Sequence, residues 1–228
     1  MKALLLLLAT ALPARADFVL NNLRHILYHE VAHAVIDQWE VPLFGPEETA
    51  ADGFALLAAH RLHGEAAMRQ LAEDVVRLAR IEAGRDLFDP WSDYMPGAQR
   101  TAWAICVYYG LAPDRRLEHA RALGLPTARV RPCAEAGDRV RRAWGVVFDA
   151  MAEAQDGTRS LRIRSGDPAL RAIKADVARL DRLVHLPRPV PVAVETCGED
   201  NAFYYHHDER IAFCQELLPT LLEYRQGG

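Results

Sequence analysis

The sequence has no excess of basic residues. Its 27 Lys and Arg stand against 31 Asp and Glu, which gives a formal net charge of −4. A mildly acidic chain without a basic stripe gives no electrostatic reason to expect a nucleic-acid partner. The sequence also lacks a phosphate-binding loop, a dinucleotide-binding glycine motif and internal repeats. With 25% charged and 50% hydrophobic residues, the 228-residue chain has the composition of a folded protein.

Long hydrophobic runs are absent beyond the N-terminus. There, Lys2 precedes an apolar run over residues 3–12, and Ala14-Arg15-Ala16 has the small-residue pattern of a signal-peptide cleavage site. A membrane anchor is the alternative, but such a run is far shorter than the about 20 residues that span a bilayer. We predict a signal peptide over residues 1–16 and a single domain over 17–228. The exported protein, periplasmic or extracellular, would have no stable membrane insertion after cleavage.

Cysteine is scarce, and no Cys-x-x-Cys pair occurs, which disfavours a zinc site made of cysteines. The four cysteines are an even number, and in an exported protein an even number favours disulfides. Four cysteines allow three connectivities. We favour the pairs that are close in sequence, Cys106–Cys133 and Cys197–Cys214, the second of which would join the arms of a hairpin. Buried free thiols are the alternative.

Hydrophobic spacing predicts an α+β fold that is rich in helices. Helices are expected over residues 21–40, with Asn21 or Asn22 as the cap, and over 46–63, 65–83, 98–109, 113–123, 134–154, 168–183 and 215–224. Strands are expected over residues 161–163 and 191–196, followed by a hairpin of 201–205 and 210–214. The small, late sheet must therefore pack on the early helices.

The first predicted helix contains the sequence His29-Glu30-Val31-Ala32-His33. Residues four apart on a helix differ by about 40° in direction and 6 Å in rise, so both imidazoles can reach a single ion. Glu30 can approach a water at that ion without being a ligand. Zinc lowers the pKa of such a water to about 7, and Glu30 would take its proton as the general base. Two surface histidines on an amphipathic helix are the alternative.

A catalytic zinc site needs a third protein ligand and one open position. Glu48 and Asp52 lie four apart on the second predicted helix and share a face. We predict that Glu48 binds the metal and that Asp52 accepts the free ring N–H of a ligating histidine. Asp52 is the main rival as the third ligand, and Glu47 is the next. His25 lies about 12 Å from His33 along the helix axis, too far for one ion, and is expected in a supporting or buried position.

The two motifs together resemble the active-site helices of thermolysin-like gluzincins. The resemblance implies a zincin-like domain in which His29, His33 and Glu48 bind zinc. It further implies that Glu30 is the base and that Asp52 supports a histidine. The chain is also similar, over residues 45–52 and 197–217 in particular, to a bacterial family of proposed metallopeptidases.

Asn201-Ala202-Phe203-Tyr204 is similar to the edge hairpin of thermolysin-like enzymes. In those enzymes the edge strand binds the backbone of the peptide substrate, which implies that Asn201 and Ala202 bind substrate here by β-augmentation. There the hairpin precedes the zinc helix, whereas in this chain it follows near the C-terminus. A purely structural hairpin closed by a disulfide is the alternative.

The sequence thus predicts a zinc-dependent peptidase that acts on a peptide or protein substrate. A catalytically weak or inactive zincin-fold module that binds peptides in the cell envelope is the alternative. A peptidase site of this kind also uses a histidine or tyrosine to steady the oxyanion. The candidates are Tyr94, Tyr204, Tyr205, His206 and His207.

Overall fold

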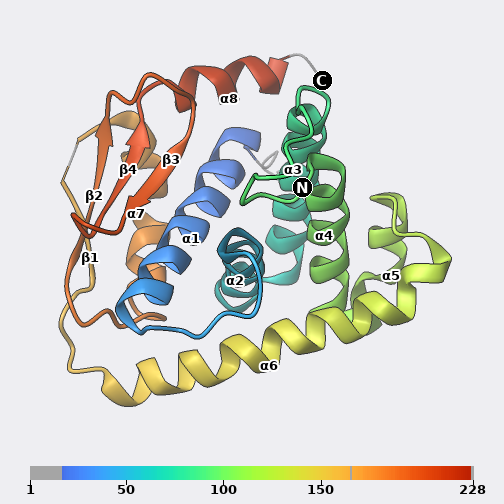
Figure 1. Ribbon diagram of the computed structural model, residues 1–228, viewed down its shortest axis with the longest axis horizontal. Coiled ribbons are helices and arrows are strands. Elements are labelled where there is room, and N and C mark those ends of the chain that lie inside the picture. Colours follow the sequence, from blue (N-terminus) through green and yellow to red (C-terminus); the bar gives the residue numbers. More distant parts are fainter. Residues whose placement is uncertain (1–16, 165, 227–228) are drawn as a thin grey trace, which may run out of the picture.

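The computed structural model describes residues 17–164 and 166–226, so the predicted signal peptide lies outside the described residues. The fold is α+β and rich in helices, as predicted, with a small sheet at one side of the molecule (Figure 1). The helices are α1 (Phe18–Gln38), α2 (Glu47–Leu62), α3 (Glu65–Ala83), α4 (Gly97–Gly110), α5 (Pro113–Ala122), α6 (Val130–Ala154), α7 (Pro168–Leu180) and α8 (Leu217–Gln226). The strands are β1 (Leu161–Ile163), β2 (Val190–Glu195), β3 (Ala202–Tyr205) and β4 (Arg210–Cys214).

Helix α1 lies at the centre of the fold. The sheet and α7 lie on one side of it, α2 and α3 lie on the other, and α8 crosses near one end (Figure 1). Its side chains are therefore buried around most of its circumference, not along one stripe. Asp17 caps the helix by accepting the Val19 N–H at 3.1 Å, so the predicted cap was wrong. Asn21 and Asn22 lie inside the helix, where Asn21 donates to Asp74 at 2.6 Å.

The strands form one sheet in the order β1-β2-β4-β3. The β1–β2 and β2–β4 pairs are parallel, whereas β3 runs antiparallel to β4 at the sheet edge and contacts α1. The Cys214 N–H donates to the Asn201 carbonyl at 2.9 Å. Because hydrogen-bonded and non-bonded pairs alternate in an antiparallel ladder, the backbone groups of Ala202 and Tyr204 face away from β4.

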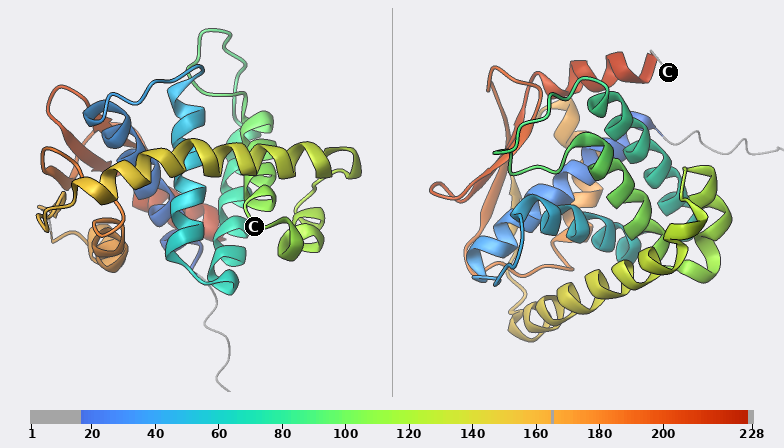
Figure 2. Two further views of the ribbon diagram at one scale, coloured as in Figure 1. Left: turned by 90° about the horizontal axis from the view of Figure 1, so that it is seen from below. Right: turned by 45° about the vertical axis from the view of Figure 1, so that its right-hand side comes forward.

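Helix α6 runs along the side of the molecule opposite α8 and packs against α4 and α2 (Figures 1 and 2). It begins at Val130, earlier than predicted, because Pro132 is tolerated in a first helical turn. Both predicted disulfides are present: Cys106–Cys133 joins α4 to α6, and Cys197–Cys214 joins β4 to the loop before β3. Within the described part of the chain, the structure contains no helix both long and apolar enough to cross a membrane.

Candidate metal centre

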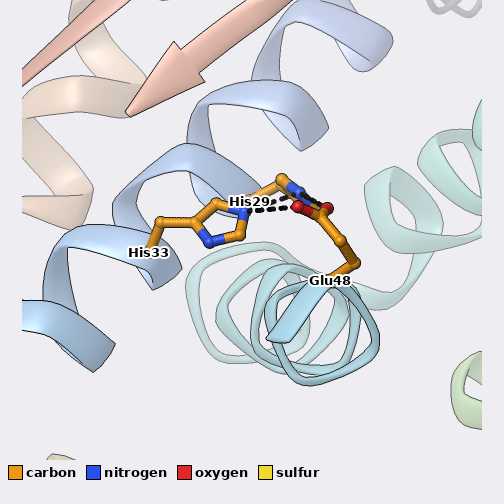
Figure 3. Close-up of side chains that lie close together, drawn as sticks. All are labelled: His29, His33 and Glu48. Atoms are coloured by element: carbon orange, nitrogen blue, oxygen red, sulfur yellow. Dashed lines mark hydrogen bonds and ion pairs between the residues drawn. The ribbon is translucent and has the colours of Figure 1, made fainter. Parts of the chain in front are cut away.

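Two helices bring the predicted metal ligands together. His29 and His33 project from one face of α1 toward Glu48, which lies in the first turn of α2 (Figure 3). The two Nε2 atoms are 3.1 Å apart. Glu48 Oε2 lies 3.0 Å from His29 Nε2, and Glu48 Oε1 lies 3.6 Å from His33 Nε2.

These separations fit a single tetrahedral ion. Zinc bonds of about 2.0–2.1 Å place tetrahedral ligand atoms about 3.3 Å apart. The ligand atoms of His29, His33 and Glu48 all lie within 4.8 Å of one another. Two imidazole nitrogens and one carboxylate form a donor set that suits zinc and leaves a fourth position open. The arrangement can therefore hold one metal ion without rearrangement of the helices.

Each histidine is oriented by a carboxylate on α2. Asp52 Oδ1 lies 3.0 Å from His29 Nδ1, and Glu47 Oε1 lies 2.7 Å from His33 Nδ1. With each Nδ1 occupied in this way, both Nε2 atoms are turned toward the metal position. Sequence reasoning placed Asp52 in this role but treated Glu47 only as a rival ligand. The tandem Glu47-Glu48 at the helix start was the available signal, because neighbouring residues on a helix point about 100° apart.

Arg100, from the first turn of α4, holds Asp52 with two hydrogen bonds of 2.8 Å. The positive charge of Arg100 and the hydrogen bond from His29 keep the pKa of Asp52 far below its usual value, against the effect of burial. Asp52 therefore stays ionised and is fully engaged. Arg100 lies after a loop and at no helical spacing from either metal motif, so its contact with Asp52 was not predicted.

Glu30 lies on the next position of α1 and lines the same cavity as His29. Glu30 is 6% exposed. Burial raises the pKa of its carboxyl to about 7, although the charges of His29 and His33 lower it. The backbone N–H of Tyr204 on β3 also lowers that pKa, which places the outward-facing backbone of the edge strand beside Glu30. The carboxyl is thus close to the metal position without being among the three ligands.

The other candidates from the sequence occupy different places. The phenol of Tyr94 lies near Glu48, and burial together with the Glu48 charge raises the pKa of Tyr94. Tyr204 instead donates to Asp37 at 2.7 Å, and the His206 ring lies 3.6 Å from the same carboxylate. The Tyr205 ring packs against the guanidinium of Arg210, and His207 is exposed at the hairpin turn.

His25 does not belong to the metal set. Its Nδ1 is buried and has no hydrogen-bond partner among the described residues. Burial lowers the pKa of His25 to about 4, so the ring is neutral near pH 7. It lines a cavity of about 480 Å³ that extends from His29 and Glu30 toward α3, α8 and the loop over residues 84–96.

A family model described as "Putative metallopeptidase" matches residues 9–148, more than half of the chain. The matched residues include α1 and α2 with all the residues of the metal centre, and they end before the sheet begins. A search of curated proteins gives no match. A search of solved structures likewise gives no match.

Proposed function

The chain belongs to the family described as "Putative metallopeptidase", and from that premise we propose that it is a zinc-dependent peptidase of the gluzincin type. The observation that carries this proposal is the convergence of His29, His33 and Glu48, with Glu30 beside them on the wall of an open cavity. When bound, zinc polarises a water and the scissile carbonyl. The remaining tasks fall to side chains of the chain itself.

Glu30 is the proposed general base. It accepts a proton from the attacking water and delivers it to the leaving amine, so that one carboxyl serves both steps of peptide hydrolysis. The position of Glu30 supports this role, since its carboxyl lines the cavity and lies outside the donor set. Asp52 and Glu47 orient the two histidines, and Arg100 fixes Asp52.

The edge strand β3 is the proposed guide for the substrate backbone. Backbone groups of Ala202 and Tyr204 face away from β4, so an extended peptide can pair with this edge as a further strand. The carbonyl of Asn201 is already bonded to Cys214, so Asn201 would contribute its side chain, which lines the cavity. The place of β3 beside α1 supports this guide role despite the changed order of the segments along the chain.

Tyr94 is the proposed group that steadies the oxyanion. Among the candidates from the sequence, its phenol lies near the metal ligand Glu48, while the Tyr204 hydroxyl is engaged by Asp37. A donor beside the metal position can stabilise the negative charge that develops on the carbonyl oxygen.

The same proposal places the mature protein outside the cytoplasm. Two disulfides within the described residues suit an oxidising compartment. We propose export through cleavage before Asp17, with residues 17–228 acting as one peptidase domain. Peptides or unfolded proteins of that compartment would be the substrates.

The test separates metal binding from hydrolysis. Glu30→Gln retains the size of the side chain and removes the base, so zinc content should stay near one per chain. Hydrolysis of casein or a quenched peptide should fall by roughly two to four orders of magnitude. In the same assay, Tyr94→Phe should retain zinc and lower kcat by about 10²–10³.

Glu118→Gln is the matched control, because Glu118 is an exposed residue of α5 remote from the metal centre. It should change neither zinc content nor rate. If zinc-loaded wild type cleaves nothing across a diverse peptide library, or cleaves no faster than Glu30→Gln, the peptidase proposal fails. The remaining interpretation is then a module that binds peptides without cutting them.

A further inference from the structure

The cavity beside the metal position is lined by side chains that have no role in the proposed peptidase mechanism. It starts at His29 and Glu30 on α1 and ends between the last turns of α3, the loop over residues 84–96 and helix α8. At about 480 Å³ it lies in the range of small-molecule and side-chain pockets, about 300–1,000 Å³. The following argument rests on the proposed function, because it concerns what the substrate places in this cavity.

Three carboxylates of the cavity lining make no hydrogen bond or ion pair within the described part of the chain. Glu82 comes from the last turn of α3, and Glu199 and Asp200 come from the loop before β3. None of these side chains makes a hydrogen bond or ion pair with another described residue. Loss of contact with water raises the pKa of Glu82, the nearby charge of Arg100 lowers it, and the nearby charge of Asp200 raises it. Arg100, which is paired with Asp52, therefore offsets part of the negative charge of Glu82 and Asp200 without forming an ion pair with either.

Two guanidinium groups, those of Arg100 and Arg85, line the cavity as well. Arg100 is held by Asp52 through two hydrogen bonds. Arg85 stacks over the Tyr224 ring, 4.7 Å from its centroid, and donates to its hydroxyl. His25 is neutral near pH 7 because burial lowers its pKa. Besides Glu30 and Asp52, the lining contains the carboxylates of Glu82, Asp86, Asp89, Glu199 and Asp200, so anionic groups outnumber these two guanidinium groups.

Apolar side chains line the same cavity as these carboxylates. They come from α1, α3 and α8 and include Ile26, Leu78, Leu217 and Leu221. A cavity lined by both apolar side chains and carboxylates matches a lysine or arginine side chain, whose methylene stem is apolar and whose end is charged. A free α-amino group offers the charge without such a stem.

We propose that this cavity is a specificity pocket that takes a lysine or arginine side chain of the peptide substrate. Glu82 and Asp200 pair with its charged end, and the apolar wall covers its stem. The loop that carries Asp200 runs directly into β3, so a peptide lying along that edge passes the mouth of the pocket.

Exposed apolar side chains around the site also suit a peptide. Among the described residues, Phe44, Leu87, Phe88 and Trp91 expose more than three quarters of their surface. They lie in the segments joining α1 to α2 and α3 to α4, which project on one side of the molecule (Figure 2). The α3–α4 segment also carries Asp86, Asp89 and Asp93, which would repel an anionic membrane and favour a basic polypeptide.

The experiment compares blocked peptides that differ at one position. N-acetylated, C-amidated peptides carrying lysine, arginine, norleucine or glutamate are offered to the zinc-loaded protein, and cleavage sites are read by mass spectrometry. Lysine and arginine should be preferred at one fixed position relative to the cut. Glu82→Gln and Asp200→Asn should each lower the lysine-to-norleucine ratio of kcat/KM by about tenfold or more.

Glu153→Gln serves as the control, because Glu153 is an exposed carboxylate on α6 outside the cavity. It should leave the ratio unchanged. A wild-type ratio near one, or a ratio that Glu82→Gln and Asp200→Asn both leave intact, would overturn the pocket. A preference that appears only for peptides with a free α-amino group would overturn it as well.

A binding measurement keeps the pocket distinct from the peptidase proposal. Zinc-loaded Glu30→Gln is titrated with the same blocked, fluorescent peptides, and lysine should bind at least about tenfold more tightly than norleucine. Tight lysine binding without any cleavage by wild type would remove the peptidase proposal and support the pocket. If wild type cleaves without a preference for lysine, and the lysine and norleucine peptides bind equally tightly, the pocket fails and the peptidase proposal is supported.

Discussion

At the residue scale, three carboxylates at the start of α2 have three different partners. Glu47 holds His33, Glu48 faces the metal position, and Asp52 holds His29. The helical geometry explains the division, because Glu47 and Glu48 point in different directions while Glu48 and Asp52 share a face. Near-identical side chains therefore have different proposed roles, and substitution should separate them.

Replacement of Glu48 and of Asp52 should affect zinc differently. Glu48→Ala removes one of three proposed ligands, so stoichiometric zinc should be lost. Asp52→Ala retains all three proposed ligands but removes the support of His29 and the partner of Arg100, and it should weaken zinc binding by about 10–100-fold. Elemental analysis after dialysis, with titration against a competing chelator, measures both. Zinc lost by Asp52→Ala but retained by Glu48→Ala would make Asp52 the ligand.

The sequence predicts the parts of this site that depend on local geometry. The spacing of His29 and His33 brings two imidazoles to one face of any helix, so their meeting required no knowledge of the fold. Arg100 and Tyr94 approach α2 only because the loop over residues 84–96 folds back toward it. No spacing rule connects them to the motif, and so their contacts came from the structure alone.

At the element scale, helices α4 and α6 are packed in backbone contact. A Cβ added at Gly137 would lie 2.2 Å from the Gly110 carbonyl carbon, and one added at Gly110 would lie 2.1 Å from the Cys133 carbonyl oxygen. Backbone atoms cannot yield as a flexible side chain can. The Cys106–Cys133 disulfide crosses the same interface, so the two helices are held too close for any side chain larger than hydrogen.

Gly137→Ala should therefore destabilise the protein although alanine favours helices. The expected loss is about 1–3 kcal/mol or more in the free energy of unfolding, because the helices must separate to admit the methyl group. Gly145→Ala on the same helix is the control, since nothing lies within 4 Å of its added Cβ. It should be neutral or stabilise by up to about 1 kcal/mol. Urea denaturation measures both, and equal effects would contradict the packing argument.

The elements themselves were largely predictable, and their ends and neighbours were less so. Hydrophobic spacing predicted α3 over the residues that the structure shows. The start of α1 was misplaced because Asp17 caps it by a local hydrogen bond, while Asn21 and Asn22, which also resemble caps, are buried. The position of β3 beside α1 is a long-range contact that periodicity cannot express.

At the scale of the whole molecule, α1 connects the metal centre to a second buried polar group. Tyr28 lies within hydrogen-bond distance of His63 at 2.9 Å, and both lie near Asp176 on α7. Burial, together with the charge of Arg24, lowers the pKa of His63 to about 4, against the raising effect of Asp176. The fold thus holds His63 neutral where an unfolded chain would protonate it.

The stability of the protein should consequently fall in acid. Between pH 6.5 and 4 the unfolded chain binds a proton at His63 that the folded chain does not, so His63 lowers the free energy of unfolding as pH falls. Its contribution approaches about 1.4 kcal/mol per pH unit. His63→Asn, which retains an acceptor for Tyr28, should reduce the slope by that amount. Urea denaturation of metal-free protein at pH 7, 6 and 5 measures the difference.

His207→Asn provides the comparison, because His207 is exposed at the hairpin turn. Its slope between pH 7 and 5 should equal that of wild type. Metal-free protein is used so that competition between protons and zinc for His29 and His33 does not contribute. If the free energy of unfolding changes equally with pH in His63→Asn and in wild type, His63 binds its proton equally well in the folded and the unfolded chain.

The contact between Tyr204 and α1 joins residues that are far apart along the chain, since Tyr204 and Asp37 are separated by 167 positions. A ribosome therefore synthesises the proposed base and metal ligands long before the strand that would guide a substrate. Until β3 docks, the face of α1 that it covers is open, and the chain lacks its proposed guide for an extended peptide. The proposed site is therefore complete only after this long-range contact has formed, late in the assembly of the fold.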